Sequence, residues 1–104
     1  MKNKKYKLRF LPLFEYDLND AVEYIRYDLG NPDAAVRLID EVEAAIKNRL
    51  NNPEAFEQYP SSRKREYPYY RIYVKNYIVF YVVIDDVMEV RRLIYKKRNM
   101  RNHI

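Results

Sequence analysis

The spacing of hydrophobic and polar residues changes along the chain, and each pattern predicts one kind of secondary structure. Residues 5–11 alternate, with Tyr6, Leu8 and Phe10 on one side and basic residues on the other. A period of two is typical of a half-buried strand. Pro12 has no backbone N–H group, so we expect the strand to end there.

Two amphipathic helices are predicted next, over residues 17–29 and 32–50. Gly30 is expected to end the first helix, because glycine tolerates the left-handed conformation, and Asn31 is expected to cap the second. So short a connection predicts an antiparallel helical hairpin. The stripes expected to face the core are Ala21, Val22, Ile25 and Leu29 in the first helix and Ala35, Leu38, Ile39, Val42, Ala45, Ile46 and Leu50 in the second.

Three apolar and aromatic runs follow a polar connector and predict strands over residues 69–75, 77–84 and 87–95. The dipeptides Lys75-Asn76 and Asp85-Asp86 separate them and suit tight turns, so consecutive strands should pair antiparallel. The sequence thus predicts a single α+β domain over residues 1–104, in the order strand, helix, helix, strand, strand, strand. The hairpin should cover one sheet face, leaving the other partly open, and the N-terminal strand should lie at an edge beside one of the later strands.

Charge is distributed unevenly along this predicted fold. Residues 1–14 carry five basic and no acidic groups, residues 15–59 carry four basic and eleven acidic groups, and residues 60–104 carry eleven basic and four acidic groups. The net charge of +5 therefore conceals an acidic helical region and a basic C-terminal region. Such separation creates faces suited to different partners.

Composition excludes several classes of site. The chain has one glycine, which rules out a glycine-rich phosphate loop, and no cysteine, which rules out disulfides and thiol chemistry. Its one histidine, His103, makes a zinc site an unfavourable interpretation. No metal or other cofactor is predicted.

No apolar run reaches the roughly 18 residues of a membrane span and no signal peptide is evident, so we expect a cytoplasmic protein with no membrane partner.

The basic residues of the C-terminal region are the main candidates for function. Arginine and lysine beside strand tyrosines suit phosphate binding and base stacking, whereas the structural interpretation is a core of aromatics with protective edge cations. Glu89 is expected to pair with Arg71 or Arg91 across the sheet. The candidates for binding a target are Lys75, Arg91, Arg92, Lys96, Lys97 and Arg101.

Two segments, NYIVFYVVIDD at residues 76–86 and VRRLIYKKRN at residues 90–99, carry a family resemblance. Together with the order of elements, they make the chain similar to the RelE/ParE toxin superfamily of bacterial type II toxin–antitoxin systems, also described as plasmid stabilisation proteins. The resemblance covers nearly the whole chain. The residues that match the family pattern are Tyr81, Val83, Arg92, Leu93, Tyr95 and Arg98.

The resemblance implies one of two activities. RelE-like members cleave mRNA on the ribosome, using arginines to hold the phosphate and a Tyr, His, Lys or Glu side chain to move protons. ParE-like members inhibit DNA gyrase. Members of both branches are neutralised by an antitoxin segment that wraps the toxin, so a cognate antitoxin is an expected partner. Whether the chain forms a homodimer or a toxin–antitoxin hetero-oligomer stays open.

The catalytic residues of the ribonuclease branch are only partly matched. The candidates are Arg71 on a strand, Arg98 at the C-terminal arginine position, Tyr95 and His103. Ile78 stands where active ribonucleases have a phosphate-binding arginine, which removes a permanent charge from the reaction site. We therefore favour a ParE-like toxin that acts by binding. The alternatives are a RelE-like ribosome-dependent mRNA endonuclease and a toxin-derived binding module with little activity.

Overall fold

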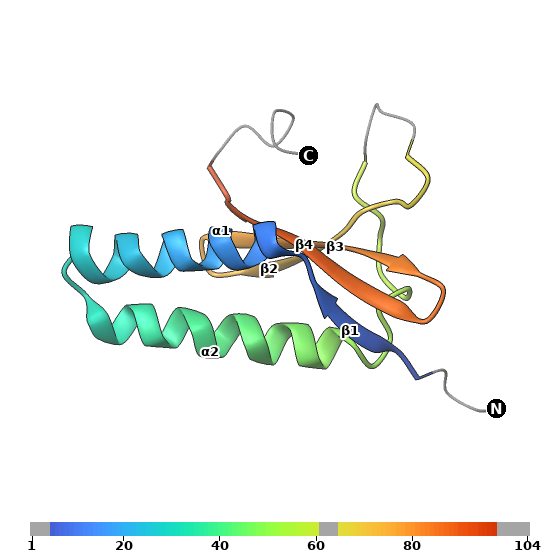
Figure 1. Cartoon of the computed structure of the whole chain (residues 1–104), viewed down its shortest axis with the longest axis horizontal. Helices are drawn as coiled ribbons and strands as arrows, with labels where there is room; N and C mark the ends of the chain where they lie inside the picture. The colour runs from blue at the N-terminus through green and yellow to red at the C-terminus, as the bar shows by residue number, and fades with distance from the viewer. Residues whose placement is uncertain (1–4, 61–64, 98–104) are drawn as a thin grey trace.

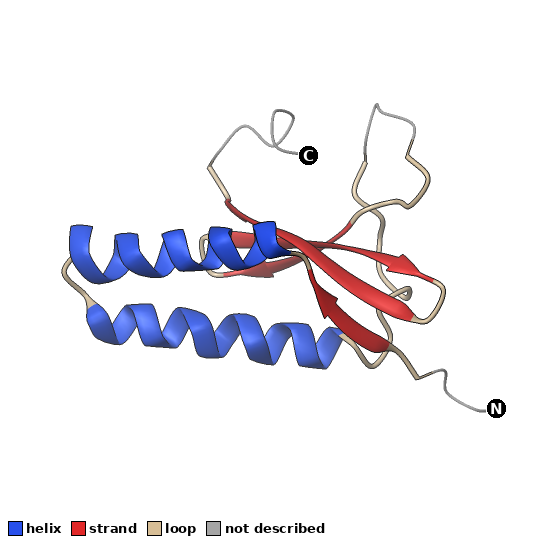
Figure 2. Cartoon of the chain, in the orientation of Figure 1, coloured by secondary structure: helices blue, strands red, loops and turns tan. Residues whose placement is uncertain are grey.

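Two antiparallel helices lie against one face of a four-stranded sheet (Figure 1 and Figure 2). The computed structural model describes residues 5–60 and 65–97. The elements are β1 (Lys7–Phe10), α1 (Pro12–Glu23), the π-helical turn η1 (Tyr24–Asp28), α2 (Pro32–Arg49), β2 (Tyr70–Val74), β3 (Tyr77–Ile84) and β4 (Val87–Tyr95). The predicted α+β architecture is confirmed.

The sheet has the order β1-β4-β3-β2. Consecutive strands β2, β3 and β4 pair antiparallel, and β1 pairs parallel with β4 at the sheet edge. Parallel pairing is possible because the helical hairpin supplies the long crossover between β1 and the rest of the sheet. The two predicted turns are confirmed, and Lys75 and Asp85 adopt the positive φ angles of 54° and 55° that such short turns require.

The first helix begins five residues earlier than predicted, at Pro12 instead of Asp17. Pro12 both ends β1 and starts α1, because its fixed φ angle suits the first helical position, where no N–H group is needed. The earlier start brings Phe14 into the core with an exposed fraction of only 3%. The prediction used Pro12 only as the end of the strand, so it missed the first turn of α1.

The end of this helix also differs from the prediction. In η1 the Leu29 amide donates to the carbonyl of Tyr24, five residues back, so the helix widens. The widening turns Leu29 away from the buried stripe and leaves it 58% exposed, so its predicted core position is wrong. Gly30 does end the helix in the left-handed conformation, with φ of 62°.

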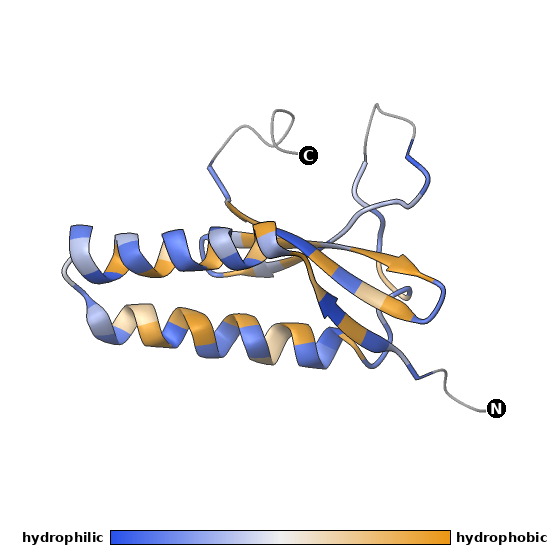
Figure 3. Ribbon diagram, viewed as in Figure 1, coloured by the Kyte–Doolittle hydropathy of each residue, from blue (hydrophilic) through white to orange (hydrophobic). Residues whose placement is uncertain are grey.

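The main core lies between the helices and the inner face of the sheet, where apolar positions concentrate (Figure 3). Asn31 caps α2 as predicted, since its Oδ1 accepts a hydrogen bond from the Ala34 amide at 3.1 Å. Of the predicted α2 stripe, Ile39, Ala45 and Leu50 are half-buried. The residues that α2 buries fully are Ala35, Leu38, Val42 and Ile46.

A second, smaller core lies on the outer face of the sheet, away from the helices. It consists of Ile78, Phe80 and Ile94, with Tyr59 and Tyr69 packed over them. Both tyrosine rings meet Phe80 edge to face, at centroid distances of 5.3 Å and 6.2 Å. The connector before β2 therefore covers part of the face that the sequence pattern left open.

No helix within the described residues is both long and apolar enough to cross a membrane.

Candidate functional site

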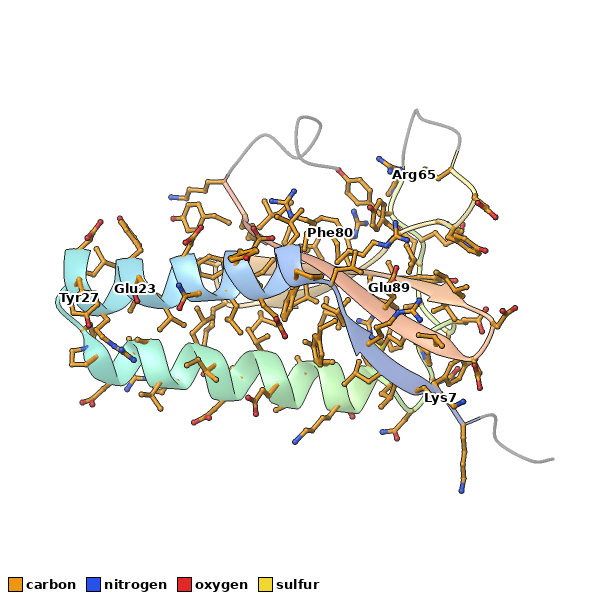
Figure 4. All side chains as sticks on the ribbon, in the orientation of Figure 1. Lys7, Glu23, Tyr27, Arg65, Phe80 and Glu89 are labelled. Atoms are coloured by element: carbon orange, nitrogen blue, oxygen red, sulfur yellow. The ribbon has the colours of Figure 1, made fainter. Side chains whose placement is uncertain are left out.

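The outer face of the sheet gathers cations and tyrosine rings. The Tyr69 ring lies beneath two guanidinium groups, with Arg65 Cζ at 4.7 Å and Arg91 Cζ at 5.8 Å from its centroid. Figure 4 labels Arg65, Phe80 and Glu89, which lie away from the helical end that Glu23 and Tyr27 mark. Guanidinium groups over tyrosine faces are stabilised by the ring quadrupole, so these contacts hold the connector against the sheet.

Arg71 lies on the same face, on the edge strand β2. Its Cζ lies 5.2 Å from the Tyr59 ring centroid and 5.8 Å from that of Tyr73, and its Nη2 contacts Glu57 Oε1 at 3.1 Å. Lys96 Nζ lies 5.6 Å from the Tyr73 centroid on the same side. Two predicted site residues, Arg71 and Lys96, are thus brought together by one tyrosine.

Glu89 is the buried anion of this face, with an exposed fraction of 6%. Arg9 Nη2 from β1 contacts its Oε1 at 2.8 Å, and Arg91 Nε donates to its Oε2 at 2.8 Å. Burial alone would raise the pKa of Glu89, but hydrogen bonds from both arginines lower it below the usual value. The predicted pairing with Arg91 is confirmed, and Arg71 pairs with Glu57 instead.

A β-bulge in β4 separates the two neighbouring arginines of the basic motif. Phe80 pairs with Arg92 whereas Tyr81 pairs with Val90, so Arg91 is an extra residue in the strand. Arg91 turns to Glu89, and Arg92 reaches α1, where its Nε and Nη2 donate to Asp17 at 2.7 Å and 3.2 Å. The bulge therefore commits Arg92 to an ion pair that ties α1 to the sheet.

Three of the five predicted target-binding cations that the structure describes are engaged in such pairs. Lys75 Nζ lies 3.7 Å from Glu41 Oε1 of α2, and Arg91 and Arg92 hold Glu89 and Asp17. Lys96 and Lys97 are exposed and form no ion pair with another described residue. Among the predicted cations that the structure describes, these two lysines after β4 are the ones left without an acidic partner.

Arg49 was not predicted from the sequence as a site residue. At the end of α2, its Nη1 donates to the Tyr81 hydroxyl at 2.8 Å and to the Arg71 carbonyl at 3.2 Å, and its Cζ stacks 3.5 Å from the Phe56 centroid. The Tyr81 hydroxyl donates in turn to the Pro53 carbonyl at 2.7 Å. Burial raises the pKa of Tyr81 although Arg49 opposes it, so the hydroxyl stays protonated as a donor. In the sequence, the one feature that could have pointed to Arg49 is its place in the last turn of the predicted helix.

Tyr95 lies on the other side of the sheet from Arg71. Arg71 pairs across the ladder with Phe80 of the outer core, whereas Tyr95 packs edge to face on Tyr77, at 5.5 Å and 68°, beside the helices. Tyr95 lines a pocket of about 310 Å³ between α1 and the ends of β3 and β4. The pocket is lined by Asp17, Asp20, Ala21, Tyr24, Tyr77, Leu93 and Tyr95.

The two described members of the predicted catalytic set are therefore not brought together. Arg71 and Tyr95 are on opposite faces, and Arg98, Arg101 and His103 lie outside the described residues. Ile78 is buried in the outer core, 5% exposed, so the position where ribonucleases have an arginine is closed to solvent. Among residues 5–60 and 65–97, no group of three side chains is placed to hold a metal ion.

A family model described as the ParE toxin of type II toxin–antitoxin system, parDE, matches residues 8–100. No curated protein sequence gives a significant match.

Several solved structures share the fold. The chromosomal ParDE toxin–antitoxin system from P. aeruginosa includes a chain that superposes with a TM-score of 0.72 at 12% identity, over 88% of this chain and 97% of that one. The E. coli DinJ-YafQ complex gives 0.54 at 9% identity, covering 88% and 92%. The archaeal RelE-RelB complex from Pyrococcus horikoshii OT3 gives 0.53 at 18%, covering 91% and 99%. At these identities the likeness establishes the fold alone.

Proposed function

This chain belongs to the ParE toxin family of type II toxin–antitoxin systems, within the RelE/ParE superfamily, and we propose that it inhibits growth by binding an essential target such as DNA gyrase. A cognate antitoxin neutralises it. Its place of action is the cytoplasm, where gyrase works.

One observation carries the choice of binding over RNA cleavage: Arg71 and Tyr95 lie on opposite faces of the sheet. A general acid or base must come within hydrogen-bond reach of the reacting group that the cation stabilises. A sheet interposed between the two side chains keeps them from acting on one phosphate. The buried Ile78 supports the same choice, because it offers no charge to a developing phosphorane.

Binding of a protein target is compatible with the charge on the outer face. The exposed Lys96 and Lys97 directly follow β4, whose last residues pair with β3. The Lys96 amide also donates to the Asn76 carbonyl at 2.7 Å, so the backbone is held at Lys96 before any partner arrives. Charges held on a rigid strand steer association and lose little entropy on binding. They are the residues of the described chain through which we propose that the target is met.

The test is expression with and without the antitoxin encoded beside the toxin gene, followed by two assays on purified chain. We expect growth arrest without the antitoxin, loss of gyrase supercoiling, and intact mRNA on translating ribosomes. Ribosome-dependent cleavage abolished by Arg71→Ala, but not by the control Arg37→Ala on α2, would establish the RelE-like alternative instead. Normal growth without antitoxin would favour the toxin-derived binding module.

A further inference from the structure

A row of exposed side chains runs along α1 and η1 on the side turned away from the core. Leu13, Tyr16 and Tyr27 are large and hydrophobic, yet they are 48%, 69% and 66% exposed. Asp20 and Glu23 lie between them in the row and are also exposed. We call these five residues the α1 ridge. Apolar side chains that gather on one surface mark interaction sites, whereas isolated ones need no explanation.

The α1 ridge has the spacing of a helix–helix seam. Its members are separated by three, four, three and four residues, as are the a and d positions of a coiled coil. Side chains at this spacing are neighbours on one helix face. The row extends about 20 Å along the helix axis, and Figure 4 labels its last two members, Glu23 and Tyr27, at the helical end of the molecule. Such a row fits a second helix laid alongside α1.

The two carboxylates in the middle of the ridge are not balanced by a cation of the described chain. Asp20 and Glu23 form no ion pair or side-chain hydrogen bond with any residue of 5–60 or 65–97. Arg26 lies against the end of the ridge, with its Cζ 5.9 Å from the Tyr27 ring centroid. The ridge is thus apolar at both ends and negative in its middle.

This arrangement of charge decides what can cover the ridge. Removing a carboxylate from water is strongly unfavourable unless a cation pairs with it. The same ridge of a second copy supplies no such cation, because parallel pairing opposes Asp20 to its own counterpart and antiparallel pairing opposes Asp20 to Glu23. Nucleic acids and anionic membranes are repelled for the same reason. The occupant must therefore bring positive charge to the middle of the row and apolar surface to its ends.

We propose that the α1 ridge docks an amphipathic helix of a protein partner that carries two basic residues in the middle of its apolar stripe. The basic residues pair with Asp20 and Glu23, and the flanking apolar residues pack on Leu13, Tyr16 and Tyr27. The charged layers fix the register of the two helices, because a shift along the axis leaves both carboxylates covered and unpaired.

This partner is distinct from the proposed growth-inhibiting target. The ridge lies on the helical hairpin and selects positive charge, whereas Lys96 and Lys97 follow β4 and select negative charge (Figure 1). Growth and supercoiling assays measure the proposed function and peptide binding measures the present proposal, so either one can fail while the other holds.

The test uses two synthetic peptides of about 18 residues, long enough to form a helix. One has leucine at its a and d positions except for two central lysines, and the other has glutamates in place of those lysines. Each is titrated into the ¹⁵N-labelled free chain. The lysine peptide should shift the amides of the α1 ridge and bind less tightly as salt is added. The glutamate peptide should bind about tenfold more weakly. The chain's net charge of +5 opposes this preference, so the preference reports the local carboxylates.

A charge swap tests the two carboxylates directly. Asp20→Lys combined with Glu23→Lys should reverse the preference, so that the glutamate peptide binds about tenfold more tightly than the lysine peptide. Asp40→Lys combined with Glu43→Lys makes the same change at the same spacing on the exposed face of α2. This matched control should keep the wild-type preference.

The apolar part of the ridge is tested at Tyr16. Tyr16→Ala should weaken binding of the lysine peptide by about tenfold, whereas Tyr16→Phe keeps the ring and should retain binding. Circular dichroism and thermal melting of each variant verify that the fold is intact.

Three outcomes would overturn the proposal. Equal binding of the two peptides by the wild-type chain would mean that the carboxylates are not recognised. A reversed preference in the α2 control would assign the effect to the acidic charge of the whole hairpin. Amide shifts centred on Leu8 and Phe10 would place the peptide in the apolar groove between β1 and the helices instead.

Discussion

The outer sheet face and the pocket beside α1 are both rich in tyrosine, but the rings meet different neighbours in the two places. On the outer face, Tyr69 is covered by Arg65 and Arg91, so its ring is already satisfied within the chain. In the pocket, Tyr24 and Tyr95 stand beside carboxylates with no described cation against them. The first arrangement ties the connector to the sheet, whereas the second leaves the rings of Tyr24 and Tyr95 partly exposed to solvent.

The two regions differ because β4 directs its two neighbouring arginines to different carboxylates. The bulge in β4 sends Arg91 to Glu89 on the outer face and Arg92 to Asp17 at the mouth of the pocket. Both arginines are therefore paired with carboxylates of this chain before any partner binds. A run of basic residues in a sequence therefore overstates the charge available for binding.

The largest effect is expected from removing the ring at the centre of the outer core. Phe80→Ala should lower the free energy of unfolding by about 3–5 kcal/mol, because Phe80 is fully buried between Tyr59 and Tyr69. Tyr24→Ala, at a half-exposed pocket ring, should cost under about 1 kcal/mol. Urea denaturation of both variants measures these changes. Comparable losses of unfolding free energy would contradict the distinction between a buried outer core and an exposed pocket ring.

The next effect concerns the buried anion of the outer face. Glu89→Gln should destabilise the protein by about 2–3 kcal/mol at neutral pH, since Arg9 and Arg91 lose their shared carboxylate. The measurement is the free energy of unfolding across pH.

The pH profile gives the sign of the Glu89 contribution. Its pKa is lowered in the folded state, so its stabilisation is fully present above the unfolded value of about 4.3 and fades as pH falls through the lower folded value. The wild-type and Glu89→Gln curves should converge below about pH 4. Parallel curves would show that the ion pairs carry no net stability.

The fold was largely predictable because its determinants are local. Alternation, the Asn31 cap, Gly30 and the two short turns each act within a few residues, and β3 and β4 have the predicted bounds. The earlier helix start depends on the packing of Phe14 into the core, and η1 depends on the bond from the Leu29 amide to the Tyr24 carbonyl, neither of which a periodicity contains. Tertiary packing overrode the local pattern at those two places.

The candidate site was less predictable, because proximity in sequence is not proximity across a sheet. Tyr95 and Lys96 are neighbours, yet alternation places Tyr95 against Tyr77 beside the helices and Lys96 over Tyr73 on the outer face. Arg49 and Arg71 are 22 residues apart and share a hydrogen bond. Their contact arises from the docking of α2 on β2, which no short motif records.

A smaller effect is expected from the hydroxyl that joins the helices to the connector. Tyr81→Phe removes the bonds to Arg49 and to the Pro53 carbonyl, and should lower stability by about 1–2 kcal/mol. The loss should act on the connector that covers the outer face, so exchange of the Tyr59 amide, which donates to Tyr69 at 2.6 Å, should accelerate. Unchanged amide exchange would mean that the connector is held by its rings alone.

The smallest effect on stability, and the most specific effect on function, is expected at the end of β4. Replacing Lys96 and Lys97 together by glutamate should change the free energy of unfolding by less than about 1 kcal/mol, since both are exposed. Inhibition of the target should fall by tenfold or more at low salt, because the charge that steers encounter is reversed. Lys47→Glu, an exposed charge reversal on α2, serves as the control and should retain inhibition. Equal loss in both would attribute the effect to net charge, whereas loss in the β4 variant alone ties target binding to the end of β4.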